Sequence, residues 1–459
     1  MTLHQSPDSE TIDILHAPPT DEDSGDIKCD SPADSLRRND ARDGTTLDLD
    51  SALDLGDDLD DFLDAVHSNN TIETLQLEGE MICSLNYDQC HQLFDALGGL
   101  PLTKLHLHNF VAPLPLLTSL LQRALNLERI TLHTAQLLGR DDVESREFLQ
   151  AIQGLQQLQA FKCTNAIVMG AGLSLETLVQ ALARVHSIQK VELELERGGE
   201  VSVESLRSLC QLPQLQELRL WRLTMNEEHL ILIANIVQYN DTMEHLELGE
   251  MGYADHGVAS YRAVADMLRN NSTLETFGMI NFSGLDDDGC VLVAEALRDN
   301  TTLLQFNMRG CDNLVMGIPA ARAVADMLAH NTCLQEFAMN TVGVDNDGAI
   351  VLAQALQNNR ALQSIMLQRI FGDNKARGFL AFLNMLETNY MLRRIYPEAE
   401  GDVKAKMDFY LSLNQLGLRQ VQLYVDTDWH HFLDLLTKSR HDLNIIFYLL
   451  STSPDFLDA

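Results

Sequence analysis

The chain has 459 residues, of which 45% are hydrophobic, so it is long and apolar enough for several packed domains or one long repeat array. Its 67 acidic residues outnumber 32 basic ones, and the formal net charge is −35. This balance argues against nucleic-acid binding and against an anionic membrane surface, because both rely on Lys and Arg to meet negative charge. The most apolar run, LNIIFYLL at 443–450, is shorter than the roughly 20 residues of a membrane-spanning helix.

The N-terminal segment, residues 1–56, is predicted to be an acidic disordered tail. Through Asp61 the chain has eighteen acidic and four basic residues, with scattered Pro and Ser. Low hydrophobicity combined with high charge is typical of segments that cannot bury enough apolar surface to fold. The first residues, MTLHQSPDSE, lack the basic start and apolar stretch of a secretory signal, so we expect a cytoplasmic protein, with a nuclear location as the alternative.

Residues 57–424 carry a recurring Leu-x-x-Leu-x-Leu frame, in which apolar and polar residues alternate as they do in a half-buried strand. Successive copies start 25 to 31 residues apart, and a near-constant period in this range predicts a solenoid of about thirteen repeats. The copies start at Ile72, Leu102, Leu127, Leu158, Ile188, Leu215, Met243, Leu274, Leu303, Leu334, Leu362, Leu392 and Leu418.

Helical patterns fill the intervals between these predicted strands. In GCVLVAEALRDNTTL at 289–303, Val291, Ala294 and Leu297 recur at the spacing of one apolar helix face. Asp288-Gly289 and Asp347-Gly348 are expected helix starts, because an Asp side chain accepts hydrogen bonds from the first helical N–H groups. Strands joined by helical crossovers are parallel, so we expect one sheet lined by the strands and backed by the helices.

These units resemble the leucine-rich repeats of the ribonuclease-inhibitor-like family. The resemblance implies an α/β solenoid, or horseshoe, with a parallel β-sheet on its concave face and helices on its convex face. Residues 425–459, beyond the last repeat, are predicted to form a helical C-terminal cap. One departure is the ninth frame position, where the family has Asn or Cys and this chain has Cys only at Cys311 and otherwise Phe110, Ala135, Ala166, Leu223, Met251, Phe282, Val342 and Ile370.

No catalytic or cofactor motif accompanies the repeats, so we expect neither an enzyme nor a bound cofactor. The MGAGLSL stretch lacks the third glycine of a dinucleotide fingerprint, since Leu175 occupies its position. The segment at 284–295 nearly fits a calcium loop, but Gly284 replaces the first ligand. His106, His108 and His133 lie near one another in the predicted sheet, which leaves a metal site as the alternative to a solvated polar face.

The cysteines and glycosylation sequons favour repeat structure over a secreted glycoprotein. None of the eight cysteines forms a Cys-x-x-Cys pair, so reduced thiols are expected. Asn-x-Ser/Thr sequons mostly fall in one repeat feature, a polar turn before an apolar residue, at Asn69, Asn240, Asn270, Asn271, Asn281 and Asn300.

The third, fifth and seventh frame positions are predicted to face the groove and to bind a protein partner. In the second to fifth repeats they hold four basic, three His and only two acidic residues, against the acidic balance of the whole chain. Trp221 and Arg219 follow on the next strand and are residue types that dominate interface energies once desolvated. The candidate binding residues are Lys104, His106, His108, Arg129, His133, Lys162, Lys190, Arg219, Trp221, His245 and Glu247.

The sequence therefore predicts a monomeric, non-catalytic scaffold or inhibitor that holds a protein partner in its groove. The alternative is a regulator of a small GTPase, since GTPase-activating proteins occur among ribonuclease-inhibitor-like arrays. That activity requires an Arg or Asn presented to the nucleotide, and the sequence singles out no such residue.

Overall fold

The computed structural model describes two compact units, Met1–Thr224 and Met225–Ala459. Within them, the described residues are Ala33, Leu36, 45–49, 58–80, 85–169, 172–249, 257–282, 285–310, 314–339, 342–367, 369–371, 376–396 and 399–415. The predicted cap at 425–459 and the thirteenth frame copy at Leu418 lie outside this part of the chain.

The first unit is a parallel sheet with helices along one face. Its main strands pair in chain order, and a short strand, β5 (Gln136–Leu138), pairs with both β3 and β6. The main strands are β1 (Thr46–Leu49), β2 (Thr74–Glu80), β3 (Lys104–Pro113), β4 (Arg129–His133), β6 (Ala160–Met169), β7 (Lys190–Glu200) and β8 (Glu217–Thr224). The helices are α2 (Leu59–Ser68), α3 (Tyr87–Leu97), α4 (Leu114–Arg123), α5 (Asp142–Gly154), α6 (Leu175–Leu182) and α7 (Val203–Cys210).

The second unit repeats this arrangement, with a further two-stranded sheet formed by β12 (Leu314–Met316) and β14 (Val342–Val344). Its main strands are β9 (His245–Gly249), β10 (Thr276–Phe282), β11 (Gln305–Gly310), β13 (Glu336–Met339), β15 (Ser364–Leu367) and β16 (Arg394–Tyr396). Its helices are α8 (Glu227–Val237), α9 (Val258–Asn270), α10 (Asp287–Arg298), α11 (Ile318–His330), α12 (Asn346–Leu356), α13 (Ala376–Leu386) and α14 (Gly401–Gln415).

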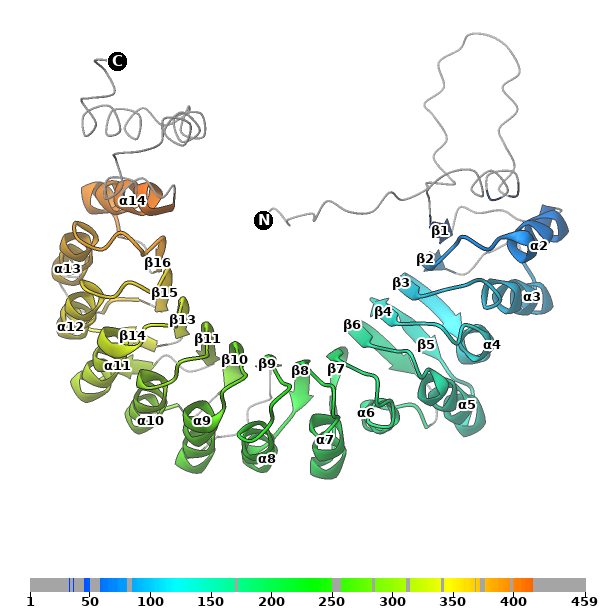
Figure 1. Cartoon of the computed structure of the whole chain (residues 1–459), viewed down its shortest axis with the longest axis horizontal. Coiled ribbons are helices and arrows are strands. Elements are labelled where there is room, and N and C mark those ends of the chain that lie inside the picture. The colour runs from blue at the N-terminus through cyan, green and yellow to red at the C-terminus, as the bar shows by residue number, and fades with distance from the viewer. Residues whose placement is uncertain are drawn as a thin grey trace, which may run out of the picture. The chain divides into compact units, whose positions relative to one another are not determined.

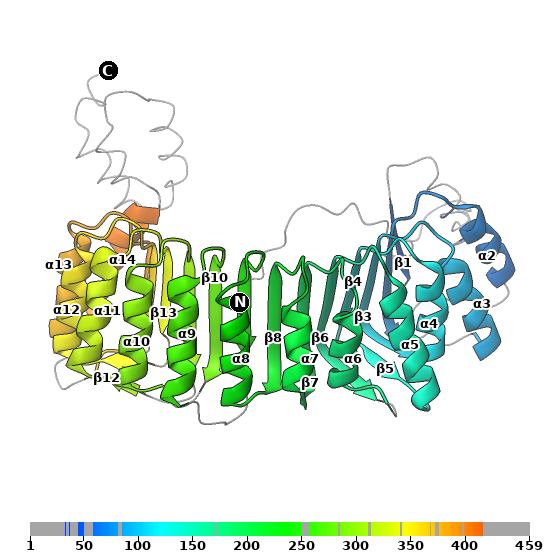
Figure 2. The same cartoon turned by 60° about the horizontal axis from the view of Figure 1, so that its bottom comes forward.

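In each unit the strands form one layer and the helices the other, as Figure 1 shows, and neighbouring helices lie side by side (Figure 2). The predicted leucine-rich-repeat solenoid is thus confirmed in both units. From β2 to β16, each main strand begins two residues after a predicted frame start. Leu218 and Leu220 are fully buried between the layers, and the intervening Arg219 faces outward, as the alternation predicts.

The sheet starts earlier than the sequence indicated. Strand β1 lies inside the predicted tail of residues 1–56 and pairs in parallel with β2, so that Leu47 lies beside Leu75. Leu47 and Leu49 are buried and Asp48 lies between them, which is the alternation of a strand with one core face. The short apolar pattern TLDL was masked by the acidic composition around it.

Two helix starts also differ from the prediction. Helix α10 is capped by Asp286, which accepts from the N–H of Gly289 at 2.8 Å, and α12 by Asp345, which accepts from Gly348 at 2.7 Å. The caps thus lie two residues before the expected Asp288 and Asp347. The near-fit to a calcium loop is accordingly the cap and first turns of α10.

A ladder of asparagines connects the turns before the strands of the second unit. Asn331 shows the pattern: its side-chain oxygen accepts from the N–H groups of Cys333 and Leu334 at 3.0 and 2.8 Å. Its amide nitrogen donates to the carbonyl oxygens of Leu297 and Asn300, one repeat earlier, at 2.7 and 3.0 Å. Asn271, Asn359 and Asn389 make the same four bonds, and Asn300 and Asn414 make part of the set.

The ladder explains the sequons. The polar turn shared by the repeats is confirmed, and Asn271 and Asn300 are buried with both ends of their amides hydrogen-bonded. A glycan on either would require unfolding of its turn. In most first-unit repeats the matching position holds an apolar residue, such as Leu155 or Val185, and backbone N–H groups close the turn instead.

We expect Asn331→Ala to lower the free energy of unfolding by about 2 kcal/mol, because four buried backbone groups lose their partner. The control is Asn270→Ala, since Asn270 is exposed and donates only within its own helix, to Asp266. That change should cost less than about 0.5 kcal/mol. Urea denaturation of both variants measures the difference, and equal midpoints would show that the ladder does not stabilise the unit.

Candidate protein-binding surface

The strand register aligns the face-pointing side chains of the first unit into three rows. The first row runs Lys104, Arg129, Ala160, Lys190, Glu217; the second His106, Thr131, Lys162, Glu192, Arg219; and the third His108, His133, Thr164, Glu194, Trp221. Adjacent members of a row belong to neighbouring strands, about 4.8 Å apart, so side chains within a row are in reach of one another.

The part of this face over β3, β4 and β6 is basic. Its nine row positions hold three cations, three His and no carboxylate, in a chain of net charge −35. The carboxylates Glu192, Glu194 and Glu217 enter the rows only on β7 and β8. The basic bias predicted for the face is therefore concentrated on one side of it.

A hollow of about 380 Å³ opens on this face. Two short side chains, Ala160 and Thr131, leave space between longer neighbours on the same strands and the strands beside them. The residues that line the hollow are His106, Arg129, Thr131, Ala160, Phe161, Lys162, Lys190, Val191, Glu192 and Glu217. It lies wholly within the first unit.

Ion pairs already neutralise the cations at the β7–β8 side of the hollow. Lys162 Nζ lies 3.1 Å from Glu192 Oε1, and Lys190 Nζ lies 3.2 Å from Glu217 Oε2. Arg219 also contacts Glu217, at 2.9 Å. Among the described residues, Lys104 and Arg129 have no hydrogen-bonding or ion-pair partner for their side chains.

The pKa of His106 reflects its burial and the positive charge of the strands β3 and β4. Desolvation lowers the pKa of its imidazole, and the neighbouring charges of Arg129 and Lys104 lower it further. All three causes favour the neutral ring.

The three histidines do not converge on a common point. His108 and His133 stack with ring centroids 5.0 Å apart, while Thr131 lies beside His106 on β4. The Nδ1 of His108 lies 3.2 Å from Glu78 Oε1, and that of His133 lies 2.8 Å from Thr164 Oγ1. Within the described ranges, no three His, Cys, Asp or Glu side chains are placed to hold a metal ion.

Trp221 and Arg222 occupy the end of β8. Trp221 is half-buried on the face, as predicted. Arg222, which the sequence did not single out, has a left-handed backbone with φ of 57°. This places its guanidinium 3.5 Å from Glu194 Oε1 and 3.3 Å from Asn165 Oδ1. Non-glycine residues seldom adopt this conformation, and here it recurs at the same frame position in Asn109, Thr134 and Asn165.

The last two predicted residues, His245 and Glu247, belong to the second unit. Both are half-buried on the face of β9, beside Thr276 and Gly278 of β10. The neighbouring face positions on β10, β11 and β13 are nearly uncharged, so the basic strip does not continue along this sheet.

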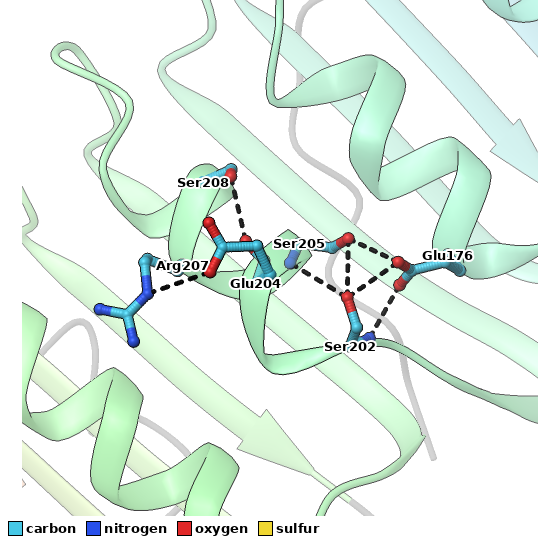
Figure 3. Close-up of polar contacts among 6 residues, drawn as sticks. All are labelled: Glu176, Ser202, Glu204, Ser205, Arg207 and Ser208. Carbon is cyan, nitrogen blue, oxygen red and sulfur yellow. Dashed lines mark hydrogen bonds and ion pairs between the residues drawn. The ribbon is translucent and has the colours of Figure 1, made fainter.

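The helix layer behind the face is fixed by polar contacts between repeats. Glu176 on α6 accepts from the N–H and Oγ of Ser202, both at 2.8 Å, and from Ser205 Oγ at 2.6 Å, while Ser202 caps α7 (Figure 3). Gln180 also donates to it, at 2.7 Å. Partial desolvation raises the pKa of Glu176, but these hydrogen bonds together outweigh it and hold the pKa below its ordinary value.

The same device recurs in the second unit. Glu227 accepts from the N–H of Gly257 at 3.1 Å, and Asp287 from that of Gly317 at 2.9 Å. Each glycine precedes the next helix, and a Cβ there would collide with the carboxylate. A side chain in the first turn of one helix thus caps the following helix across the repeat.

Five cysteines fall in the described part of the chain, and all are free thiols: Cys90, Cys163, Cys210, Cys290 and Cys333. Burial raises the pKa of Cys163 and of Cys210 to about 12, so neither is a reactive thiolate. No described helix has the length and apolarity to cross a membrane.

Comparison with known proteins finds only distant likenesses among solved structures. No protein-family model and no curated protein matches the sequence. Solved structures do match: the leucine-rich-repeat ectodomain of the receptor kinase GASSHO1/SCHENGEN3 from Arabidopsis thaliana, at 14% identity and a TM-score of 0.42, covers 75% of this chain and 35% of its own. A leucine-rich-repeat protein of Leptospira interrogans is 13% identical, with a TM-score of 0.40, and the match covers 75% of this chain and 82% of that protein. A chain of the yeast Rad7 and Elc1 complex is 16% identical, with a TM-score of 0.42, and the match covers 74% of this chain and 82% of that chain.

We expect Glu176→Gln to speed amide exchange in the first turn of α7 severalfold at pH 7, because a neutral amide accepts the Ser202 and Ser205 bonds more weakly. A depressed folded-state pKa stabilises the fold above the unfolded pKa and loses that effect as the pH falls through the folded value. In the parent chain, the protection factor, which corrects the exchange rate for its intrinsic pH dependence, should therefore fall as the pH drops below the unfolded glutamate pKa of about 4.3, and in the variant this step should be absent. Hydrogen exchange between pH 7 and 3 measures both, and an unchanged pH profile would contradict the role of Glu176.

Proposed function

We propose that this chain is a non-catalytic scaffold or inhibitor that holds a protein partner against the strand face of its first unit. The observation that carries the proposal is the basic strip over β3, β4 and β6, which borders one side of a 380 Å³ hollow. This strip lies on a chain of net charge −35. Exposed cations that gather against the overall charge mark a contact surface, because their placement is not needed to fold the sheet.

The repeat architecture supports the same function. A parallel sheet with its register set by buried leucines presents side chains at fixed spacing, which gives a wide and rigid contact surface. Trp221 adds an aromatic anchor at the end of the same face, with Arg219 and Arg222 beside it.

The test is to capture partners from cell extract and map the bound complex by hydrogen exchange. Protection of β3 to β8 on binding is expected, with the outer surfaces of α3 to α7 unchanged. Protection confined to the helices would refute the proposal, and so would a captured partner that leaves the exchange of both layers unchanged.

We expect Trp221→Ala to weaken binding of the captured partner by about 2 kcal/mol, or roughly 30-fold, with little change in melting temperature. Tyr239→Ala is the matched control, since Tyr239 is an aromatic residue exposed by 81% that follows α8 at the turn, away from the strand face. Titration calorimetry compares the two. A Trp221 variant that binds normally but melts lower would mean that the ring only packs on its neighbours.

A further inference from the structure

We infer that the hollow, which extends over the face from β3 to β8, binds the carboxylate of an acidic side chain of the protein partner, with Arg129 as its main ligand. This inference rests on the proposed function and assigns the chemistry of the group that the partner presents. It also assigns a direction, because the carboxylate lies toward β3 and β4 and away from β7 and β8.

The hollow offers a set of unused donors. Arg129, Thr131 and His106 line it, and no hydrogen bond or ion pair joins their side chains to any described residue. A guanidinium, a hydroxyl and an imidazole N–H can all donate to one carboxylate, and an Arg binds it with two parallel bonds. Ala160, beside Arg129 in the first row, keeps the space open for that group.

The ion pairs set the direction. Lys162 and Lys190 line the same hollow, but each is within 3.2 Å of a glutamate. A carboxylate placed beside them would meet Glu192 and Glu217 and be repelled. On the other side, Lys104 adds a second unpaired cation next to Arg129.

The net charge of the chain selects the kind of acidic partner. The net charge of −35 opposes the approach of a polyanion, which carries many negative charges close to the surface. At physiological salt, ions screen charges that are more than about 8 Å apart. A single carboxylate on a near-neutral surface meets mainly the local cations. The occupant is therefore an isolated Asp or Glu of a near-neutral protein surface.

The probe is a net-neutral decapeptide with capped ends, one central Glu and one terminal Lys, titrated against the full chain by fluorescence anisotropy. Its counterpart has Gln at both positions and is also neutral. We expect the Glu peptide to bind at least tenfold more tightly than the Gln peptide. Arg129→Gln should lower the affinity for the Glu peptide at least tenfold. Lys190→Gln should lower it less than threefold, although both variants lose one positive charge.

A cavity-filling variant separates a built site from a general charge effect. Ala160→Leu leaves the charge unchanged and fills the hollow, so it should lower affinity for the Glu peptide at least tenfold. Gln305→Leu is the control, because Gln305 is exposed at the same frame position on β11 of the second unit, outside the hollow. Both variants should melt close to the parent chain, since both positions face outward.

His106 provides an independent readout. Its pKa lies below the ordinary value in the unoccupied hollow, and a bound carboxylate stabilises the charged ring, so saturation with the Glu peptide should raise it. NMR titration of the labelled imidazole measures this shift. Equal losses from Arg129→Gln and Lys190→Gln, an unaffected Ala160→Leu variant, or an unshifted His106 would each overturn the inference.

Three further outcomes test the inference, and the last two separate it from the proposed function. A near-neutral phosphoserine peptide that binds tenfold more tightly than the Glu peptide would assign the hollow to a phosphorylated partner and overturn the carboxylate. If no peptide binds while a captured partner still protects β3 to β8, the carboxylate site fails and the scaffold stands. If the Glu peptide binds as expected while the captured partner protects only the helices, the scaffold fails and the carboxylate site stands.

Discussion

The turn before each strand determines the rest of the second unit. Its backbone N–H and carbonyl groups are buried between neighbouring repeats, and leaving them unpaired would cost more than most side-chain contacts contribute. One asparagine per turn supplies both an acceptor for its own repeat and donors for the previous one, as Asn271, Asn331, Asn359 and Asn389 do in full. Each repeat is thereby held to its neighbour at the point where the strand starts, which fixes the strand register.

The two units satisfy this constraint in different ways. Most turns of the first unit close with backbone bonds such as Leu158 N–H to Leu155 carbonyl, and an apolar side chain replaces the asparagine. Asn69, in the first repeat, also accepts from the N–H groups of Thr71 and Ile72, and the asparagines then recur in every turn from Asn240 to Asn389. The uninterrupted run of turn asparagines therefore starts at the boundary between the two compact units, and it is visible in the sequence at one repeat position.

Much of the fold was predictable because it depends on a local pattern repeated many times. The period of the leucines, their alternation and the polar turns predicted the strands, the parallel sheet and the face residues. Strand β1 was missed because four residues give too short a pattern within acidic surroundings. The asparagine ladder was read only as a polar turn, because its function appears when Asn331 is seen to bond across to Leu297, 34 residues earlier.

The candidate site was less predictable, for a physical reason. The sequence identifies which residues face outward, but it treats Lys104, Arg129, Lys162 and Lys190 alike. Whether a long side chain is free depends on which carboxylate lies on the next strand and whether both rotamers allow contact. Lys162 meets Glu192 and Lys190 meets Glu217, whereas Arg129 has Lys104 on one side and Ala160 on the other.

This asymmetry gives the face more selectivity than its net charge would. If all four cations were free, the surface would attract any anion that overcame the repulsion of the whole chain. Because Glu192 and Glu217 occupy one side of the hollow, a second negative group there would be repelled, and discrimination comes from repulsion as much as from attraction. The paired lysines and glutamates thus limit the position of an incoming carboxylate. The space above Ala160 limits the size of the group that carries it. The strand register set by the turns therefore fixes a specific arrangement of charge on the face.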